Sequence, residues 1–230
     1  MIDIHTHILP GCDDGSRSWE STLEMCQQAA DDGVRHIVAT PHANFEYEYN
    51  RDAHAAKIDE LRSRFPALRF SLGCDFHVSY DNVEDALRNP GRYTIDNSRY
   101  LLVEFSDYTA PVRFMDPIFP LLAAGFIPIV THPERNGVLL HHPEMVDELV
   151  GEGCLVQVTA NSLTGFWGER PKKMSIDLLK REMVHFIASD AHDTRRRTTV
   201  LSAGVKVAVG IIGEMAASRL VNDNPRAIVG

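Results

Sequence analysis

The sequence predicts an α/β fold in which seven strand–helix units form one closed or slightly open β/α barrel. Short apolar runs rich in β-branched residues alternate with longer stretches of helical periodicity, and this alternation is typical of parallel sheets. The chain has 230 residues, a length that single-domain barrels commonly reach, and we find no linker, repeat or low-complexity tract in it. The expected strands span residues 2–5, 36–40, 68–74, 100–105, 127–131, 155–159 and 184–188.

The stretches between these strands predict helices. Residues 19–32 carry an apolar face, with Ser18 as the expected N-cap and Gly33 as the stop. We expect further helices over residues 53–65, 112–124, 143–151 and 171–181, and one or two closing helices over 197–215. Residues 1–221 are expected to form a single domain, followed by a loose tail over 222–230. A doubly wound open sheet is the alternative architecture, because it uses the same strand–helix alternation.

Composition limits the classes of function. The net charge of −9 argues against a general nucleic-acid binder, although bound cations would still permit an anionic substrate. We expect no export signal, because the first residues lack a basic leader and an apolar core, and no apolar run is long enough to cross a bilayer. The cysteines Cys12, Cys26, Cys74 and Cys154 are scattered, without a Cys-x-x-Cys pair. A cytoplasmic protein with reduced thiols and no membrane insertion is therefore expected. The oligomeric state is not indicated.

Six of the seven expected strands end in residues that can bind a metal ion. In β/α barrels the active site lies at the C-terminal ends of the strands, so these side chains should converge. The spacings His5-x-His7 and Asp190-x-His192 can each aim two ligands at one ion. Imidazoles and carboxylates together suit Mn, Zn, Fe or Mg, and the set is large enough for two or three ions. The candidates are His5, His7, Asp13, Asp14, His42, Asp75, Glu104, His132, Asp190 and His192.

Arginines lie in the same expected loops. Arg135 follows His132 by three residues, and Arg197 ends a run of three arginines after His192. Guanidinium groups grip phosphate with two parallel hydrogen bonds, so arginine beside metal indicates phosphoryl transfer to water. A lone His-x-His pair is more often structural, and a run such as 195–197 is more often solvated. A purely structural or solvated role does not suit Glu104, because an unpaired carboxylate in an apolar strand costs free energy.

The histidines outside the candidate ligand set are expected to have structural roles. The remaining histidines are His36, His54, His141, His142 and His185, while His77 competes with Asp75 as a ligand, and we favour Asp75. Two interpretations stay open for aromatic residues in the loops after the second and sixth strands, namely binding of an aromatic leaving group or packing of a loop. These residues are Phe45, Tyr47, Tyr49, Phe166 and Trp167.

A cysteine or serine nucleophile is not supported. A cysteine-based phosphatase needs an arginine six residues after its cysteine, and the residues at that spacing are Ser18, Asp32, Tyr80 and Ala160. The chain also contains neither a glycine-rich P-loop nor a Gly-x-Ser-x-Gly elbow.

Five short motifs form a set that is found together in one superfamily. The opening Met-Ile-Asp-Ile-His-Thr-His-Ile-Leu-Pro-Gly-Cys-Asp-Asp-Gly-Ser is followed by Ala39-Thr40-Pro41-His42, Leu102-Val103-Glu104-Phe105, Thr131-His132-Pro133-Glu134-Arg135-Asn136 and Ser189-Asp190-Ala191-His192. This set resembles the polymerase and histidinol phosphatase (PHP) superfamily over about residues 1–215. More narrowly, the Asp-Asp-Gly and His-Pro-Glu-Arg segments resemble the bacterial manganese-dependent protein-tyrosine phosphatases of capsule and exopolysaccharide synthesis.

The resemblance implies a distorted seven-stranded TIM-like barrel with three divalent ions. Manganese is the first expectation, with Fe, Zn, Mg or Co as alternatives. Asp75 stands where the family usually has glutamate, and its shorter arm puts the metal spacing at that point in question. The implied ligands are His5, His7 and Asp190 for one ion, Glu104 and His132 with Asp75 as a bridge for the second, and Asp14, His42 and His192 for the third.

The resemblance also implies a reaction and a substrate. Arg135 and Arg197 would bind the phosphate of a phosphotyrosyl protein, by resemblance a bacterial tyrosine autokinase that controls polysaccharide synthesis. We expect one-step hydrolysis by a metal-activated water, with the proton for the leaving group supplied by Asp14, His42 or His192. Three alternatives stay open: a small-molecule phosphatase such as histidinol phosphatase, an amidohydrolase-type metal hydrolase, and a non-enzymatic metal-binding barrel.

Overall fold

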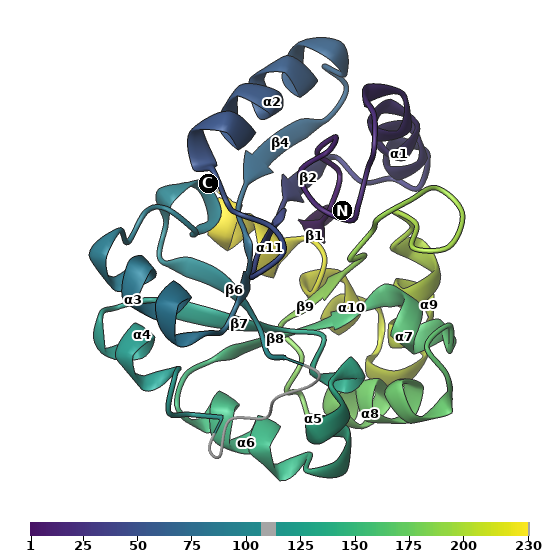
Figure 1. The fold of residues 1–230 in the computed structure, drawn as a ribbon. Helices are drawn as coiled ribbons and strands as arrows, with labels where there is room; N and C mark the ends of the chain where they lie inside the picture. Colours follow the sequence, from purple (N-terminus) through teal and green to yellow (C-terminus); the bar gives the residue numbers. More distant parts are fainter. Residues whose placement is uncertain (107–113, 230) are drawn as a thin grey trace.

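The computed structural model describes residues 1–106 and 114–229, and Figure 1 shows their strands surrounded by helices. The described strands are short and pair in parallel, as two hydrogen-bonded sheets with the orders β1-β2-β4 and β3-β5-β6-β7-β8-β9. The expectation of a parallel α/β fold is confirmed. The strands are β1 Ile2–Thr6, β2 His36–Ala39, β3 His42–Ala43, β4 Arg69–Leu72, β5 Asp75–His77, β6 Tyr100–Glu104, β7 Ile127–Thr131, β8 Leu155–Thr159 and β9 Phe186–Ala188.

Two short strands that the sequence analysis does not predict follow two of the expected ones. The strand expected over 36–40 is β2, which ends at Ala39, and the additional strand β3 begins after Pro41, which has no backbone N–H to donate. The strand expected over 68–74 is β4, which ends at Leu72, and the additional strand β5 begins at Asp75. The two additional strands place His42 and Asp75 opposite each other as partners in the β3–β5 ladder.

Backbone hydrogen bonds also join the end of β1 to the segment after β9. The Asp190 N–H donates to the His5 carbonyl at 2.9 Å, and the His7 N–H donates to the Ala191 carbonyl at 2.9 Å. The first and last strands of the described chain are therefore neighbours, and their C-terminal ends bring His5 and His7 close to Asp190.

The strands are apolar on both faces, as parallel strands covered on both sides should be. On β6, Leu101 and Val103 belong to the larger buried cluster, whereas Leu102 between them belongs to a smaller one. The smaller cluster takes residues from several strands and from the C-terminus, and Glu104 continues along the Leu102 side of β6. Apolar packing at one end of this face thus gives way to polar side chains at the strand ends.

Helices form in each of the expected stretches with somewhat different bounds, and the helices at residues 80–88, 137–141, 160–164 and 223–229 are additional. Ser18 caps α1 by accepting a hydrogen bond from the Ser21 N–H at 3.2 Å, and Gly33 just beyond the helix has a φ of +89°. Among the described residues, we find no helix with the length and apolarity needed to cross a membrane. The helices are α1 Trp19–Asp31, α2 Arg51–Arg64, α3 Tyr80–Arg88, α4 Phe119–Ala123, α5 Gly137–His141, α6 Glu144–Gly151, α7 Ala160–Thr164, α8 Glu169–Lys180, α9 Ser202–Ile212, α10 Glu214–Arg219 and α11 Asp223–Val229, with short 3-10 turns η1 Ile95–Asn97 and η2 Pro133–Arg135.

Two expected helices begin later than the sequence predicts. Of the helix expected over 112–124, residues 112 and 113 lie outside the described residues, and within the rest only Phe119–Ala123 is helical. The helix expected from Arg197 begins at Ser202, because the Arg197 carbonyl accepts hydrogen bonds from the His192 and Asp193 N–H groups instead. Gly213, with a φ of +82°, then separates α9 from α10.

The expectation of a loose tail over 222–230 is wrong for residues 223–229. These residues form α11, in which Pro225, Ile228 and Val229 are buried. Ile228 and Val229 pack in the smaller cluster with Ile2 and Ile4 of β1. A single turn or two of helix gives too short a periodic pattern to be recognised from the sequence, and its packing on a distant strand decides the outcome.

Substitution of Ile228 tests this packing. The Ile228→Ala variant should lose about 2–4 kcal/mol of unfolding free energy, because it removes buried methyl groups and leaves a cavity. Chemical denaturation measures the loss, with Met215→Ala as the control, since Met215 is 83% exposed. If the midpoint of Ile228→Ala matched that of the wild type, the packing of α11 against β1 would be contradicted.

Candidate metal centre

The nine metal ligands that the family resemblance implies lie together in the structure, at or beyond the C-terminal ends of the strands. The tenth candidate, Asp13, lies behind His7 instead. Their side-chain ligand atoms fall into four overlapping groups, within each of which the atoms lie within 4.8 Å of one another. The groups are His7, Asp14, His42 and His192; His5, His7 and Asp75; His5, His132 and Asp190; and His42, Asp75 and Glu104. Residues far apart in the sequence therefore converge because parallel strands end at the same side of the sheet.

Three atoms at the inner side of the cluster have the spacing of a coordination shell. His5 Nε2 lies 3.2 Å from His7 Nε2 and 3.4 Å from Asp190 Oδ1, and His7 Nε2 lies 3.3 Å from the same oxygen. Two ligand atoms bound to one ion at about 2.1 Å lie roughly 3.0–3.4 Å apart when their bonds make angles of about 90–110°. This triangle of atoms therefore has the size of one face around a single divalent ion.

A second region lies at the outer side of the cluster. Asp14 Oδ1 is 3.5 Å from His42 Nε2 and 3.3 Å from His192 Nε2. The Asp14 side chain is 47% exposed, which makes it the most open of the nine predicted ligands. An ion between these three side chains would thus face solvent and an entering substrate.

Asp75 lies between the regions. Its Oδ2 is 3.3 Å from His5 Nε2 and 3.3 Å from His42 Nδ1. On its far side, Glu104 Oε1 lies 3.5 Å from His132 Nε2, and Glu104 Oε2 lies 3.7 Å from His42 Nδ1. The short aspartate arm therefore reaches the central position of the cluster.

Hydrogen bonds behind three histidines fix the orientation of their rings. His5 Nδ1 donates to Gln157 Oε1 at 2.9 Å, and His7 Nδ1 donates to Asp13 Oδ2 at 2.7 Å. His192 Nδ1 lies 3.0 Å from the Asp190 carbonyl oxygen. An acceptor behind Nδ1 leaves Nε2 unprotonated and facing the centre, as metal-binding histidines require.

Sequence reasoning missed the role of Gln157 and assigned no orienting role to Asp13. Gln157 lies in β8, which matches the one of the seven expected strands whose end offers no His, Asp or Glu, so a search for those ligand types does not find it. Its position in a parallel strand beside the ligand-bearing strands was the signal that could have found it. Asp13 also accepts hydrogen bonds from the Gly15 and His42 N–H groups, at 2.9 and 3.1 Å.

Removal of the Asp13 carboxylate should weaken metal binding without removing a ligand. In Asp13→Ala, His7 loses the acceptor that fixes its ring, and the affinity for Mn²⁺ should fall by about 10–100-fold. Titration calorimetry with the metal-free protein measures the change, and Asp31→Ala on the surface of α1 serves as the matched control. An unchanged affinity in Asp13→Ala would count against the orienting role.

The electrostatics of the cluster favour positive charge at its centre. Burial lowers the pKa of His42 and His132, and it lowers that of His192 to about 4, so these rings keep a free lone pair at neutral pH. Burial would also lower the pKa of His5 and His7, but the carboxylates around them more than offset it. All five rings can therefore accept a cation, whether as a metal ion or, for His5 and His7, as a proton.

The pKa values of the carboxylates also indicate that the cluster favours positive charge at its centre. Burial would raise the pKa of Asp75, but His5, His42 and His132 hold it below its usual value. The pKa of Glu104 is raised well above its usual value by burial and by the charges of Asp75 and Asp190.

Several of these buried atoms lack a hydrogen-bond partner within the described chain. They are both carboxylate oxygens of Asp75, His42 Nδ1 and His192 Nε2. Unpartnered buried donors and acceptors are costly, and a divalent ion would satisfy these atoms together. The residues present therefore fit a metal centre.

Two of the predicted arginines flank the cluster. Arg135 Nη1 donates to Asp190 Oδ2, and Arg197 Nη2 donates to the same oxygen at 2.5 Å. Arg195 and Arg196 are exposed, and their backbone N–H groups are held by Asp193 Oδ1 at 2.6 Å each. Of the run 195–197, Arg197 thus reaches the cluster, while its two neighbours behave as the solvated charges that such a run usually contains.

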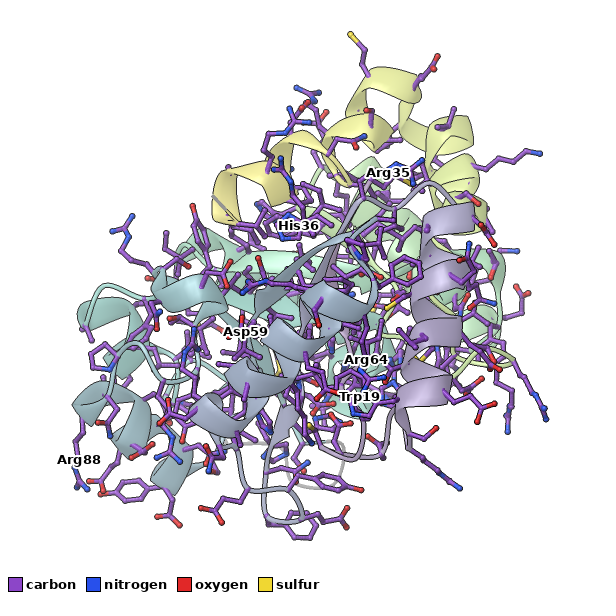
Figure 2. The ribbon with its side chains drawn as sticks, turned by 90° about the horizontal axis from the view of Figure 1, so that it is seen from above. Trp19, Arg35, His36, Asp59, Arg64 and Arg88 are labelled. Atoms are coloured by element: carbon purple, nitrogen blue, oxygen red, sulfur yellow. The ribbon has the colours of Figure 1, made fainter. Side chains whose placement is uncertain are left out.

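The histidines interpreted as structural have other environments. His36 Nε2 hydrogen-bonds to Ser71 Oγ at 2.8 Å, and Figure 2 shows it beside the C-terminal helices. His185 Nδ1 accepts a hydrogen bond from the Val156 N–H, and His141 and His142 lie on or just after α5. Among the described residues, neither these nor His54 and His77 belong to the four ligand groups.

The aromatic residues after the second expected strand divide into two kinds. Tyr49 is buried and its hydroxyl donates to the Gly73 carbonyl at 2.8 Å, so it packs the core. Tyr47 stacks on His42 with ring centroids 6.1 Å apart, and Phe45 is 92% exposed. Packing therefore explains Tyr49, whereas Tyr47 lies against His42 of the candidate site.

The chain thus has a parallel α/β fold with a cluster of histidine and carboxylate side chains at its strand ends. It shares its fold with a lactonase from Listeria monocytogenes, at a TM-score of 0.66 and 11% identity. It also shares its fold with histidinol phosphate phosphatase from Lactococcus lactis. That match has a TM-score of 0.57 and 12% identity, and it covers 92% of this chain and 93% of that one. At this level of identity the likeness concerns the fold alone.

The chain belongs to the CpsB/CapC family of capsular polysaccharide synthesis, which it matches over residues 1–230. It is 35% identical to tyrosine-protein phosphatase YwqE of Bacillus subtilis, over 86% of this chain and 79% of that protein. It is 30% identical to tyrosine-protein phosphatase CpsB of Streptococcus pneumoniae, over 100% of this chain and 98% of that protein. One of the crystal structures of YwqE and CpsB, described as unique metal-dependent tyrosine phosphatases, matches with a TM-score of 0.93 and 30% identity, covering 100% of this chain and 94% of that one. The family resemblance found in the sequence is confirmed.

Proposed function

We propose that this chain is a metal-dependent protein-tyrosine phosphatase. The observation that carries the proposal is the convergence of nine metal-binding side chains beside two arginines that share the carboxylate of Asp190. The relatives named tyrosine-protein phosphatase support the substrate class. Residues 1–221 would form the phosphoesterase domain, and the packing of α11 on β1 attaches residues 223–229 to it.

We also propose that the strands form one distorted seven-stranded barrel. Two observations support it: β2 and β4 are each continued by β3 and β5, and backbone hydrogen bonds join β1 to the segment after β9. A barrel would explain why ligands from the first and last strands meet, since closure makes them neighbours.

The proposed centre holds three divalent ions, with manganese as the native metal and Fe, Zn, Mg or Co as alternatives. Such ions would acidify water and neutralise phosphate oxygens. The interatomic distances support three sets of protein ligands. These are His5, His7 and Asp190; Glu104 and His132, with Asp75 as the bridge; and Asp14, His42 and His192.

Arg135 and Arg197 would bind the phosphoryl oxygens. Their guanidinium groups carry fixed positive charge, which stabilises the charge that spreads over the phosphoryl group in the transition state. Burial lowers the pKa of Arg135, but Asp190 more than offsets it and keeps the group charged. The two arginines already converge on one carboxylate oxygen, so they can also converge on an oxygen of a phosphate bound next to that carboxylate.

The leaving phenolate needs only modest help, because the pKa of a phenol is about 10. The attacking water gives up a proton, and the phenolate takes one up. Asp14, His42 and His192 are the side chains positioned to pass this proton, directly or through water. Asp14 is the most exposed of the three, and the histidines around it lower its pKa, so it is a charged acceptor at neutral pH.

The proposed partner is a phosphotyrosyl protein, in particular a bacterial tyrosine autokinase that controls capsular or exopolysaccharide synthesis, in the cytoplasm. The family name and the tyrosine phosphatases among the relatives support this partner. A nucleic-acid substrate is not part of the proposal, since the net charge is −9.

A comparison of substrates tests the proposal. The manganese-loaded protein should hydrolyse a phosphotyrosyl peptide with a kcat/KM well above that for histidinol phosphate, and inorganic phosphate should inhibit it. A preference for histidinol phosphate would favour the small-molecule phosphatase. Hydrolysis of an amide without inhibition by phosphate would favour the amidohydrolase reaction.

Metal removal and thiol blocking should have opposite outcomes. Chelation should lower the phosphatase rate by at least about 10²-fold, and added Mn²⁺ should restore it. Iodoacetamide should leave the rate largely unchanged, because burial raises the pKa of every cysteine, to about 12 for Cys26 and Cys154. A chelated protein that keeps its activity, or a thiol-blocked protein that loses it, would contradict the proposed chemistry.

A further inference from the structure

Trp167 lies against both arginines of the proposed phosphate site. The Cζ atom of Arg135 lies 4.2 Å from the centroid of the Trp167 ring, and that of Arg197 lies 5.7 Å from it. Both guanidinium groups also donate to the same oxygen of Asp190. A single aromatic ring therefore contacts the two groups that are proposed to grip the substrate phosphate.

Backbone hydrogen bonds shape the loop that carries Trp167. Gly165 and Gly168 flank Phe166 and Trp167 with φ angles of +91° and +97°, a region that glycine enters without strain. The Phe166 N–H donates to the Asn161 carbonyl at 3.0 Å, and the Gly168 N–H donates to the Gly165 carbonyl at 3.0 Å. These bonds make a tight turn directly after α7.

The same loop is tied to the turn that carries Arg135. The buried carboxylate Glu134 Oε1 accepts hydrogen bonds from the Ser162 hydroxyl of α7 at 2.7 Å and from the Thr159 N–H at 2.9 Å. Glu134 is the neighbour of Arg135 in η2, so one buried group fixes both the arginine and the turn that presents the tryptophan.

This arrangement suits positioning of the two guanidinium groups. The donors of a guanidinium lie in its plane, so contact of the carbon centre with a ring face leaves those donors free for an anion. The ring face attracts cations and thereby offsets part of the repulsion between two like charges held on one oxygen. Arg197 Nε is buried without a hydrogen-bond partner, which leaves a donor for a ligand.

We propose that Trp167 is a positioning residue that holds Arg135 and Arg197 in the geometry for binding the phosphoryl group. The proposal rests on the phosphatase function proposed above and adds a residue to its phosphate site. The competing role for this ring is to form a wall for the aryl group of the substrate, which Phe166 would share, since it packs edge-on against Trp167 at 5.0 Å and is 43% exposed.

The chain contains a matched control for this contact. Trp19, the only other tryptophan in the sequence, has Arg64 over its ring at 4.7 Å. Figure 2 shows the two labelled side chains together where α1 and α2 approach each other. Trp19→Leu therefore removes an arginine–tryptophan contact of the same kind that involves no residue of the proposed site.

Inorganic phosphate distinguishes the two roles, because it has no aryl group. In Trp167→Leu, the inhibition constant for phosphate and the KM for a phosphotyrosyl peptide should both rise by about tenfold, the loss expected for contacts with two cations. Trp167→Phe should stay within about threefold of the wild type, since it keeps a ring face. Trp19→Leu should match the wild type in both constants.

A rise in KM with an unchanged phosphate constant would overturn the proposal and assign Trp167 to the aryl group. Unchanged values for both constants would also overturn it. A wild type without phosphatase activity would refute the proposed function alone, since the positioning role can be measured by binding.

In Trp19→Phe, Trp167 is the sole tryptophan, and its fluorescence should respond saturably to inorganic phosphate. Absence of that response would contradict the proposal even if Trp167→Leu failed to fold.

Discussion

The Asp190→Asn variant is expected to lose at least about 10³-fold in kcat/KM, because one carboxylate serves both proposed parts of the site. Its Oδ1 lies 3.3 Å from His7 Nε2 and 3.4 Å from His5 Nε2, while its Oδ2 accepts from both arginines. An amide can present its oxygen to only one of these sides, and its NH₂ group would face either a metal ion or a guanidinium. The metal affinity should therefore fall together with the activity.

The choice of asparagine makes this variant informative. Asp190 has a φ of +52°, and asparagine tolerates this left-handed conformation as aspartate does, so the backbone should be preserved. Asp96→Asn is the matched control, since Asp96 has a φ of +46° and accepts a hydrogen bond from the Leu72 N–H away from the ligand cluster. Steady-state kinetics with manganese measure both variants. Near-normal activity in Asp190→Asn would remove the carboxylate from the mechanism.

Loss of either arginine of the proposed phosphate site should have the second largest effect. Arg135→Ala and Arg197→Ala should each lower kcat/KM for a phosphotyrosyl peptide by about 10²–10³-fold, since each removes charge from the transition state. Lysine should not restore the rate, because it lacks the planar fork that binds two oxygens. The double variant should lose less than the product of the single losses, because both groups act on one phosphoryl group.

The run 195–197 supplies a control for these variants. Arg195 is exposed and is tied to Asp193 through its backbone, so Arg195→Ala should stay within about threefold of the wild type. Metal content should be the same in all variants, which separates phosphate binding from metal loss. Equal effects of Arg195→Ala and Arg197→Ala would show that general positive charge matters, and would contradict a specific role for Arg197.

Much of the candidate ligand set could be predicted because the rule behind it depends on local sequence alone. A polar residue directly after an apolar run lies at a strand end, and parallel strands bring their ends together. His42 and Asp75 illustrate what the structure adds, since they lie in the additional strands β3 and β5 and are ladder partners there.

The features that sequence reasoning missed depend on contacts across the fold. Gln157 matters because its amide oxygen lies behind His5, and Asp13 matters because it holds the ring of His7. The packing of Ile228 against β1 is likewise decided by residues more than two hundred positions away in the sequence. The sequence left the role of Trp167 open for the same reason, since Arg135 and Arg197 meet its ring only after folding.

The central claim is that these side chains together hold a cluster of divalent ions beside Arg135 and Arg197. A crystal structure of the manganese-loaded protein with phosphate, with ions located by anomalous scattering, tests it most directly. We predict three anomalous peaks within the ligand groups around Asp75, and a phosphate whose oxygens contact both guanidinium groups. An absence of peaks among these ligands, or a phosphate bound elsewhere on the protein, would contradict the claim.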